Sequence, residues 1–315
     1  MGKTKFCQGI SDISDSYMGF IIDLWGVLHD GKKAYEGAVD TLKELRGRKK
    51  QIILLSNTPH RAIEVKEQLK KMGIGPSLYD MILTTSEMIC TELKEKNDRF
   101  FENLGDKCFL INKTQDVTIF DDSNIELVDD IKDASFILIA GADPRFPTAG
   151  DWEKILKEGV RRRLKAICAN PDSKALIGTN FLMGPALFSK RYQDFGGVVH
   201  YVGKPHMPIF QKCIQWMQEK EIYPGEMVMI GDTMAHDILG AYNANMDTCL
   251  IKTGIHNAHF MQATTPAETD KILNILTAQY NNIRPTYLVD KFEWGKALPD
   301  RKHKKRKLLT KKVKA

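Results

Sequence analysis

The chain has 315 residues, of which 43% are hydrophobic, and this is enough for two domains with a real core. The six cysteines are scattered without a C-x-x-C pair, which favours reduced, mostly buried thiols over disulfides or a zinc site. No apolar run approaches the length of a membrane span, and the first residues lack the apolar region of a signal peptide, so we expect a cytoplasmic protein with no membrane span.

The formal net charge of +6 comes from one end of the chain. Residues 301–315 contain nine Lys or Arg and no acid, and removing these nine from the total of 46 leaves 37 bases against 40 acids. The body is therefore slightly acidic, and the tail is a separate basic segment. Such runs are usually disordered and solvated, and nonspecific contact with nucleic acid or anionic lipid is the alternative. Nothing in the body indicates nucleic-acid binding.

The N-terminal part of the chain alternates between strand and helix patterns. Residues 1–17 are polar and lack a clear period, so we expect an irregular lead-in. The apolar run from Gly19 to Ile22 is too short for a helix, and it predicts a buried strand that ends at Asp23. After it we expect a loop to Tyr35, helices over 36–48, 59–73 and 86–94, and strands over 51–55 and 79–83.

The middle of the chain has the pattern of a second, smaller α/β unit, with strands over 107–112, 136–140 and 166–169 and a helix over 152–164. The pattern of the first unit then resumes. We expect a strand over 197–202, a helix over 207–220, a strand over 227–230, a helix over 235–243, a strand over 248–251, a mostly helical segment over 256–282 and a late strand over 285–289.

These alternating patterns predict an α/β fold whose core is a Rossmann-like, doubly wound parallel sheet. The core is interrupted by an inserted smaller α/β domain, and Gly196 and Gly197 supply hinge material near its end. We expect the core to comprise residues 18–85 and 199–290, the inserted domain residues 86–198, and the tail residues 301–315.

Polar residues with complementary chemistry follow four of the predicted strands. They are Asp23, Ser56, Asn57, Lys204 and Asp232, with Asp237 five residues further on. Ligands of open α/β sheets bind outside the carboxyl ends of the strands. A carboxylate nucleophile, phosphate-oxygen donors, a cation and metal ligands are the groups that phosphoryl transfer uses. Singly, each residue has an ordinary explanation as a turn, surface or helix-start residue, but their joint occurrence favours a site.

At these residues the chain resembles the haloacid dehalogenase (HAD) superfamily, and in particular its class IIA, the NagD-like and p-nitrophenyl-phosphatase-like phosphatases. The resemblance covers about residues 18–255. It is carried by Asp23-Leu-Trp-Gly-Val, Ser56-Asn57, Gly203-Lys204-Pro205, Gly231-Asp232-Thr-Met-Ala-His-Asp237-Ile-Leu-Gly-Ala241 and the phrase Ala169-Asn-Pro-Asp172. It implies a C2-type cap as the inserted domain and a Mg²⁺-dependent phosphatase acting on a small phosphorylated metabolite.

The resemblance also implies roles for individual residues. Asp23 is the nucleophile that forms an aspartyl phosphate. Mg²⁺ is bound by Asp23, Asp232 and the backbone carbonyl of Trp25. Asp237 anchors metal-bound waters or orients Lys204.

The remaining implied roles concern the phosphate. Ser56 and the backbone of Asn57 donate hydrogen bonds to the phosphoryl oxygens, and Lys204 offsets the negative charge of the nucleophile and the phosphate. In the cap, Asn170 and Asp172 follow a predicted strand and either face the substrate or form a turn. Relatives of this class often form homodimers through the cap.

The first motif departs from the family pattern at Trp25. Most HAD phosphatases have a second Asp there, which protonates the leaving oxygen, whereas an indole N–H only donates hydrogen bonds. Three interpretations follow. The substrate has a good leaving group, or His29, Asp30 or His206 replaces the missing acid, or the site is a catalytically weak phosphate-ligand sensor or scaffold. For Trp25 itself we expect burial against the cap or stacking on a substrate ring, with burial favoured.

Overall fold

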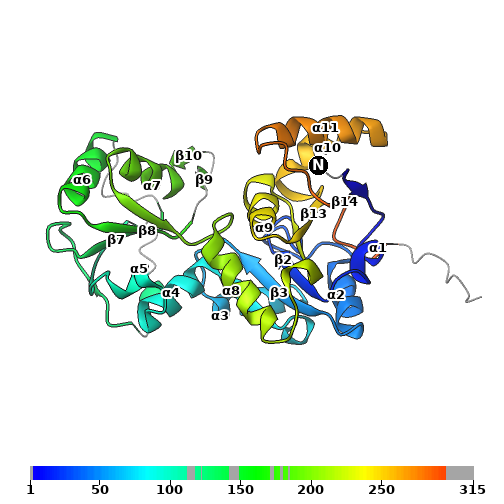
Figure 1. Ribbon diagram of the computed structural model, residues 1–315, viewed down its shortest axis with the longest axis horizontal. Coiled ribbons are helices and arrows are strands. Elements are labelled where there is room, and N and C mark those ends of the chain that lie inside the picture. The colour runs from blue at the N-terminus through cyan, green and yellow to red at the C-terminus, as the bar shows by residue number, and fades with distance from the viewer. Residues whose placement is uncertain are drawn as a thin grey trace, which may run out of the picture.

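The computed structural model describes residues 3–111, 118–121, 123–141, 149–170, 174–177, 180–183 and 185–295. Its elements form two lobes that lie side by side (Figure 1). The larger lobe contains a seven-stranded parallel sheet, and the smaller lobe contains a five-stranded parallel sheet. The predicted tail over 301–315 lies outside the described residues.

The large sheet reverses its strand order at its centre. In space its strands follow the order β1 (Lys5–Phe6), β14 (Tyr287–Val289), β13 (Asp247–Ile251), β12 (Met227–Gly231), β2 (Gly19–Asp23), β3 (Gln51–Ser56) and β4 (Met81–Thr84). From β2 the chain winds outward through β3 and β4, and from β12 it winds outward the other way through β13 and β14. Ligands of such sheets bind at the carboxyl ends of the strands where the order reverses, which here is the boundary between β2 and β12.

Helices cover both faces of the large sheet. Phe20 and Ile22 of β2 pack in one hydrophobic cluster with α2 (Ala38–Gly47) and α3 (Ala62–Lys71), and Ile21 packs in another with α8 (Met207–Gln218). Every residue of β2 is buried, as expected of a central parallel strand. This arrangement confirms the predicted Rossmann-like, doubly wound core with an inserted α/β cap.

The smaller lobe is built on a sheet in the order β11 (Val198–Tyr201), β8 (Lys165–Cys168), β7 (Phe136–Ile139), β5 (Lys107–Ile111) and β6 (Glu126–Leu127). An antiparallel hairpin of β9 (Lys174–Ile177) and β10 (Asn180–Met183) accompanies it. Met88 and Ile89 of α4 (Thr85–Glu95) belong to the same hydrophobic cluster as Phe136 and as Ile21 of the core. The lobes therefore share apolar packing beneath α4.

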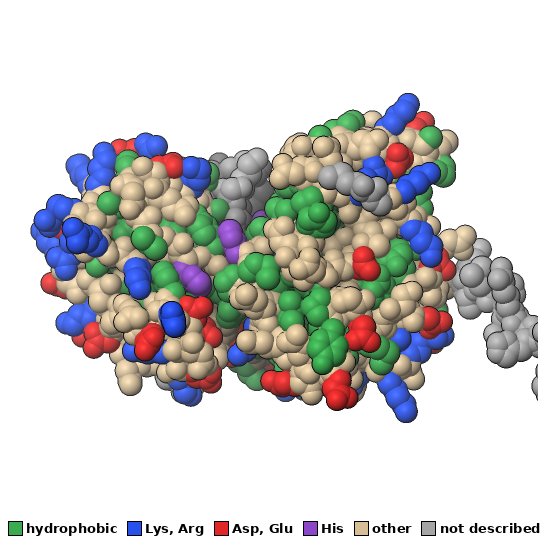
Figure 2. Space-filling model, in the orientation of Figure 1, with side chains coloured by type: hydrophobic (Ala, Val, Ile, Leu, Met, Phe, Trp, Pro, Cys, Tyr) green, Lys and Arg blue, Asp and Glu red, His purple; other side chains and the backbone are tan. Residues whose placement is uncertain are grey.

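The other helices are shorter or lie toward the outside of the lobes. They are α1 (Ser11–Ser14), α5 (Arg99–Glu102), α6 (Ala149–Arg161), α7 (Pro185–Asp194), α9 (Leu239–Asn243), α10 (Asn257–Phe260) and α11 (Pro266–Ala278). Figure 2 shows Lys and Arg side chains gathered over the outer end of the smaller lobe, and histidine side chains at the junction between the lobes.

Two segments differ from the sequence prediction. The strand predicted over 197–202 as part of the core is β11, and it pairs with β8 in the smaller sheet, so the predicted domain limit at residue 198 falls at the start of a cap strand. A short apolar run suits either sheet, and only its pairing decides between them. The lead-in over 1–17 is not irregular throughout, because β1 pairs with β14 at the sheet edge and α1 follows it.

Candidate active site

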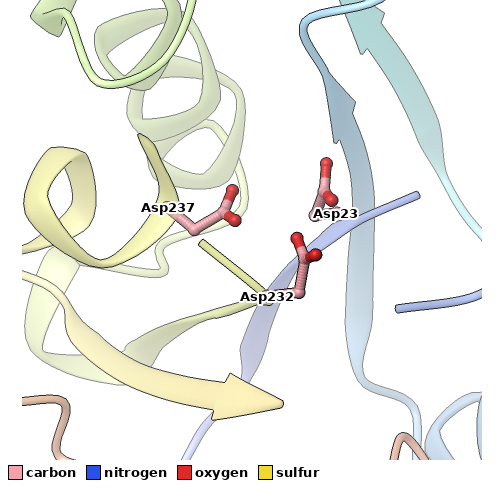
Figure 3. Close-up of side chains that lie close together, drawn as sticks. All are labelled: Asp23, Asp232 and Asp237. Atoms are coloured by element: carbon pink, nitrogen blue, oxygen red, sulfur yellow. The ribbon is translucent and has the colours of Figure 1, made fainter. Parts of the chain in front are cut away.

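Three carboxylates meet at the point where the strand order reverses. Asp23 ends β2, Asp232 follows β12 directly, and Ile22 lies opposite Ile230 in the sheet register. Asp237 comes from a π-helical turn over Met234–Ile238. All three are buried, and a carboxylate oxygen of each lies within 4.8 Å of the others (Figure 3). Sheet topology thus brings Asp23 to two acids that lie about 200 residues further along the chain.

Lys204 bridges two of these acids. Its Nζ lies 2.6 Å from Oδ1 of Asp23 and 2.6 Å from Oδ1 of Asp237. The side chain is buried, and burial alone lowers a lysine pKa. Here the charges and hydrogen bonds of Asp23 and Asp237 outweigh burial and raise the pKa of Lys204 above its ordinary value. The lysine therefore stays charged and partly neutralises the acidic cluster.

Asp237 is held from both sides. Its Oδ2 accepts hydrogen bonds from the backbone N–H of Thr233 at 3.0 Å and from the Thr233 hydroxyl at 2.7 Å. Burial raises the pKa of Asp237, but Lys204 and Thr233 more than offset this, and the pKa lies below its usual range. A Cβ on Gly231 would lie 2.2 Å from the Asp237 carboxyl carbon, so glycine is required there. The geometry fixes the carboxylate with one oxygen on Lys204.

Asp232 sits in a cradle made of two glycines. Its Oδ2 accepts a hydrogen bond from the backbone N–H of Ile255 at 2.7 Å. Gly26 and Gly254 have φ angles of 87° and 80°. A Cβ on either would lie 2.4 Å or 2.0 Å from that same oxygen. Glycine meets both demands, the left-handed backbone and the close approach.

The cluster carries more negative charge than Lys204 can balance. Burial, together with the charge of Asp237, raises the pKa of Asp23 to about 7 despite Lys204. Burial, together with the charges of Asp23 and Asp237, raises the pKa of Asp232 to about 8. A buried set of carboxylate oxygens whose negative charge one lysine does not balance fits a hard divalent cation such as Mg²⁺. These residues therefore suit the predicted metal, with Asp23, Asp232 and the Trp25 carbonyl as the expected ligands.

The second motif supplies a clamp that the sequence did not reveal. The Asn57 side chain donates from Nδ2 to the carbonyl of Lys204 at 3.0 Å, and its Oδ1 accepts from the Lys204 backbone N–H at 2.8 Å. This pair of bonds fixes the backbone that carries the lysine. Ser56 ends β3, and its Oγ accepts from the N–H of Thr58 at 3.3 Å. A side-chain amide following a strand end is the signal from which the clamp could have been suspected.

A cleft of about 640 Å³ lies over these groups. Both lobes contribute, since Asn170 of the smaller lobe lines it, whereas Asp172 lies outside the described residues. Trp25 also lines the cleft and is 54% exposed, so the prediction of a buried indole is wrong. The chain turns directly after Trp25, where Gly26 has a φ of 87° and its N–H donates to the carbonyl of His29 at 2.9 Å. The predicted residues in the lining are Asp23, Trp25, Ser56, Asn57, Asn170, Lys204, Asp232 and Asp237.

The candidate replacement acids lie in different places. His29 lines the cleft, and its Nδ1 accepts a hydrogen bond from the N–H of Gly31 at 3.0 Å, so the neutral ring carries its proton on Nε2. The Asp30 carboxylate is exposed and accepts from two backbone N–H groups of its own loop. His206 stacks on Tyr201 and is not part of the cleft lining. His60 and His236 line the cleft and were missed by the sequence reasoning.

Comparison with known proteins gives consistent matches. A family model for haloacid dehalogenase-like hydrolases matches residues 20–126, and a HAD-hydrolase-like model matches residues 201–293. The acid sugar phosphatase of Staphylococcus haemolyticus is 24% identical over 245 residues, 76% of this chain and 87% of that protein. The ribonucleotide monophosphatase NagD of Escherichia coli is 23% identical over 244 residues, 75% of this chain and 87% of that protein.

The fold has a matching solved structure. A haloacid dehalogenase-like hydrolase from Brucella suis superposes with a TM-score of 0.69 at 24% identity, covering 90% of this chain and 98% of that one. The first matched segment contains Asp23 and Ser56, and the second contains Lys204 and Asp232. The doubly wound core, the acid–lysine site at the strand-order reversal and the two matching family models together identify a hydrolase of the HAD type. The chain belongs to the haloacid dehalogenase-like hydrolase family, in its NagD-like class IIA.

Among the described residues, no helix has both the length and the apolar character needed to cross a membrane.

Proposed function

We propose that the protein is a Mg²⁺-dependent phosphatase that hydrolyses a small phosphorylated metabolite through a phosphorylated Asp23. The observation that carries the proposal is the surrounding of Asp23. This buried carboxylate faces the cleft, with the Lys204 ammonium at 2.6 Å and a carboxylate oxygen of Asp232 within 4.8 Å. The names of the relatives, an acid sugar phosphatase and a ribonucleotide monophosphatase, support a phosphoric monoester as substrate.

In the proposed reaction an Asp23 oxygen attacks phosphorus, and the ester oxygen leaves with the electrons of the P–O bond. Lys204 offsets the charge of the nucleophile and the phosphate, and Ser56 with the Asn57 backbone binds the phosphoryl oxygens. Water then attacks the phosphorus of the acyl phosphate, which restores the Asp23 carboxylate and releases inorganic phosphate. A bound Mg²⁺ supplies positive charge that keeps the carboxylates ionised and draws electron density from the phosphate.

The leaving oxygen receives no proton from residue 25, because the indole of Trp25 is not an acid at neutral pH. General acid catalysis is typically worth ~10²–10⁴-fold in rate, so the proposed enzyme turns over slowly on substrates with poor leaving groups. Among the described residues, His29 is the one of the three replacement candidates that lines the cleft. Its Nε2–H can donate a hydrogen bond to the leaving oxygen, but burial lowers the pKa of His29 and Nδ1 accepts from Gly31, so the neutral ring has no acidic proton to transfer.

A phosphate-release assay tests the proposal. The protein is assayed with Mg²⁺ and with EDTA on acetyl phosphate, p-nitrophenyl phosphate, sugar phosphates and nucleotides, alongside Asp23→Asn. We expect Mg²⁺-dependent release that is lost in Asp23→Asn, with acetyl phosphate and p-nitrophenyl phosphate favoured. Folded protein that binds Mg²⁺ but releases no phosphate beyond the Asp23→Asn level contradicts it and supports the phosphate-ligand sensor.

A further inference from the structure

The side chain that replaces the usual acid lies open to the cleft. Trp25 is 54% exposed, and Ile255, which also lines the cleft, is 58% exposed. Tryptophan is highly buried on average, and two large apolar side chains exposed beside a buried charged site mark a place where a ligand or partner makes contact. Trp25 follows the proposed nucleophile by two residues and lines the same cleft, so a group attached to a phosphate on Asp23 can reach it.

The two apolar side chains are held by adjoining turns. The Thr253 hydroxyl donates to the carbonyl of Gly26 at 2.7 Å, and the N–H of Ile255 donates to Asp232 at 2.7 Å. These bonds fasten the segment that carries Ile255 to the turn that follows Trp25. On the other side, a Cβ built on Gly31 would lie 3.5 Å from Nε1 of Trp25, so the loop backs the indole edge. The turns that carry Trp25 and Ile255 are therefore bonded to each other and to Asp232 of the acid cluster.

We propose that Trp25 is a stacking platform for a planar ring on the leaving group, with Ile255 lining the same cleft, and that the substrate class is an aryl phosphate. This inference rests on the proposed phosphatase function. An indole offers a flat apolar face to which an aromatic ring packs better than an aliphatic ring of the same size. We call these two side chains the Trp25 platform.

Leaving-group chemistry points to the same class. A phenol such as tyrosine has a pKa of about 10, whereas that of water, which is close to an alkyl alcohol, is about 15.7. When the P–O bond breaks, a phenolate therefore departs with its electron pair and takes its proton from solvent, without an acid on the enzyme. The same substitution thus removes the acid that alkyl phosphates need and supplies the surface that an aryl group uses.

Phosphonates separate ring recognition from leaving-group ability, because their C–P bond does not break. The Mg²⁺-loaded protein is titrated with phenylphosphonate and with cyclohexylphosphonate, and both dissociation constants are measured by calorimetry. We expect phenylphosphonate to bind about 3- to 10-fold more tightly, the range expected of an aromatic pair. Binding should also quench the fluorescence of the exposed indole.

Variants assign the effect to the platform. Trp25→Leu should abolish the preference for phenylphosphonate, whereas Trp25→Phe, which keeps a ring, should retain most of it. Trp216→Leu is the matched control, because this indole lies on α8 and pairs with Lys220 outside the cleft lining, and it should retain the full preference. If Trp25→Leu does not fold, the comparison of wild type with Trp25→Phe and the indole quenching still decide.

The outcomes distinguish the two proposals. Equal binding of the two phosphonates, or binding of neither, overturns the Trp25 platform, and so does a preference that persists in Trp25→Leu. If the Trp25 platform is overturned but acetyl phosphate is still hydrolysed, the proposed phosphatase function stands without the platform. A phenyl preference that depends on Trp25 in a protein that hydrolyses nothing supports the platform and overturns the catalytic proposal.

Discussion

Lys204 is placed by its backbone as much as by its charge. The Asn57 side chain holds both the N–H and the carbonyl of this residue, at 2.8 Å and 3.0 Å, while the ammonium reaches Asp23 and Asp237. The side-chain amide of Asn57 thus fixes where the backbone of Lys204 lies relative to the end of β3. Small displacements at such positions are costly, because phosphoryl transfer depends chiefly on alignment and charge.

Asn57→Ala is expected to lower kcat by about 10- to 100-fold, because a loss of alignment of about 1 Å can cost 10²-fold. Steady-state kinetics on acetyl phosphate and the melting temperature measure the effect. Thr85→Ala is the control, since its hydroxyl makes only a 3.5 Å contact with Asn57, and it should leave kcat within a few-fold of wild type. An Asn57→Ala enzyme with wild-type kcat contradicts the clamp.

Trp25→Asp tests whether the lack of an acid at position 25 limits the rate. Restoring a carboxyl at this exposed position should raise kcat/KM on a sugar phosphate, by up to the ~10²–10⁴-fold that general acid catalysis supplies. Acetyl phosphate should respond much less, because its leaving acetate needs no proton. The ratio of the two rates is the measurement. A ratio that does not change from wild type to Trp25→Asp means that another group already provides the proton.

At this scale the sequence predicts residue identity better than side-chain contacts. The predicted residues Asp23, Asp232, Asp237 and Lys204 do come together. Asp23 and Asp232 meet because their strands end at the same edge of one parallel sheet, whereas Lys204 follows β11 of the smaller sheet and Asp237 lies on the turn after β12. The catalytic and metal-binding roles assigned to them stay predictions. The amide that follows β3 marked Asn57 as a candidate, but neither its partner, the Lys204 backbone, nor the exposure of Trp25 could be predicted, since each depends on the path of a loop rather than on a periodic pattern.

At the scale of elements, the turns after the strands shape the acid cluster. Gly26 and Gly254 come from two different turns, and both leave space for the same oxygen of Asp232 because they lack a Cβ. Gly231, at the end of β12, leaves space for the Asp237 side chain in the same way. The acids can therefore approach these turns only because the turns carry glycines, and a side chain at any of the three positions would collide with an acid.

Gly254→Ala is expected to abolish the rise in melting temperature that Mg²⁺ produces, because the new Cβ meets Asp232 at 2.0 Å. The glycine also has a φ of 80°, which costs an alanine about 1–2 kcal/mol by itself. Gly73→Ala separates the two effects, since Gly73 has a φ of 86° and no other group within 4 Å of the place that a Cβ would occupy. It should lose stability but keep its response to Mg²⁺, and equal losses of response would contradict the explanation.

The boundaries of elements were predictable where a pattern is long and periodic. The strand predicted over 51–55 and the helix predicted over 207–220 agree closely with β3 and α8. The sheet to which β11 belongs was predicted wrongly, because four half-exposed residues carry no signal for their pairing partner. The edge strand β1 was missed for the same reason, since its two residues are exposed. Pairing is a property of the assembled sheet rather than of the segment.

For the whole molecule, the buried acids make stability depend on pH. The pKa of Asp23 is raised to about 7 and that of Asp232 to about 8, first by burial and then by neighbouring carboxylates. An unfolded Asp has a pKa of about 3.9, so between about pH 4 and pH 8 these two carboxyls bind more protons in the folded chain than in the unfolded chain. Burial lowers the pKa of four histidines, which opposes this effect below about pH 6.5; they are His29, His200, His206 and His256. From about pH 7 upward the free energy of unfolding therefore falls as pH rises.

With EDTA present, the melting temperature is expected to fall from pH 7 to pH 8.5, and Mg²⁺ should restore it most strongly at the upper end. Other carboxylates are already ionised in this range and contribute little. Asp232→Asn removes one of the two raised groups, so its melting temperature should fall less steeply. Calorimetric scans at each pH provide the measurement, and parallel curves for wild type and Asp232→Asn in EDTA would show that this carboxyl does not titrate there.

The position of the cap in the chain has a consequence for biosynthesis. β2 lies between β3 and β12, and β12 follows β2 by about 200 residues, which a ribosome takes on the order of 10–40 s to add. Until then one edge of the largely apolar β2 has no partner, although the cap sheet is already complete at Tyr201. A nascent chain of this protein therefore carries a finished cap on an open core sheet. Its exposed strand edge is a natural substrate for chaperones and a point at which slow translation favours aggregation.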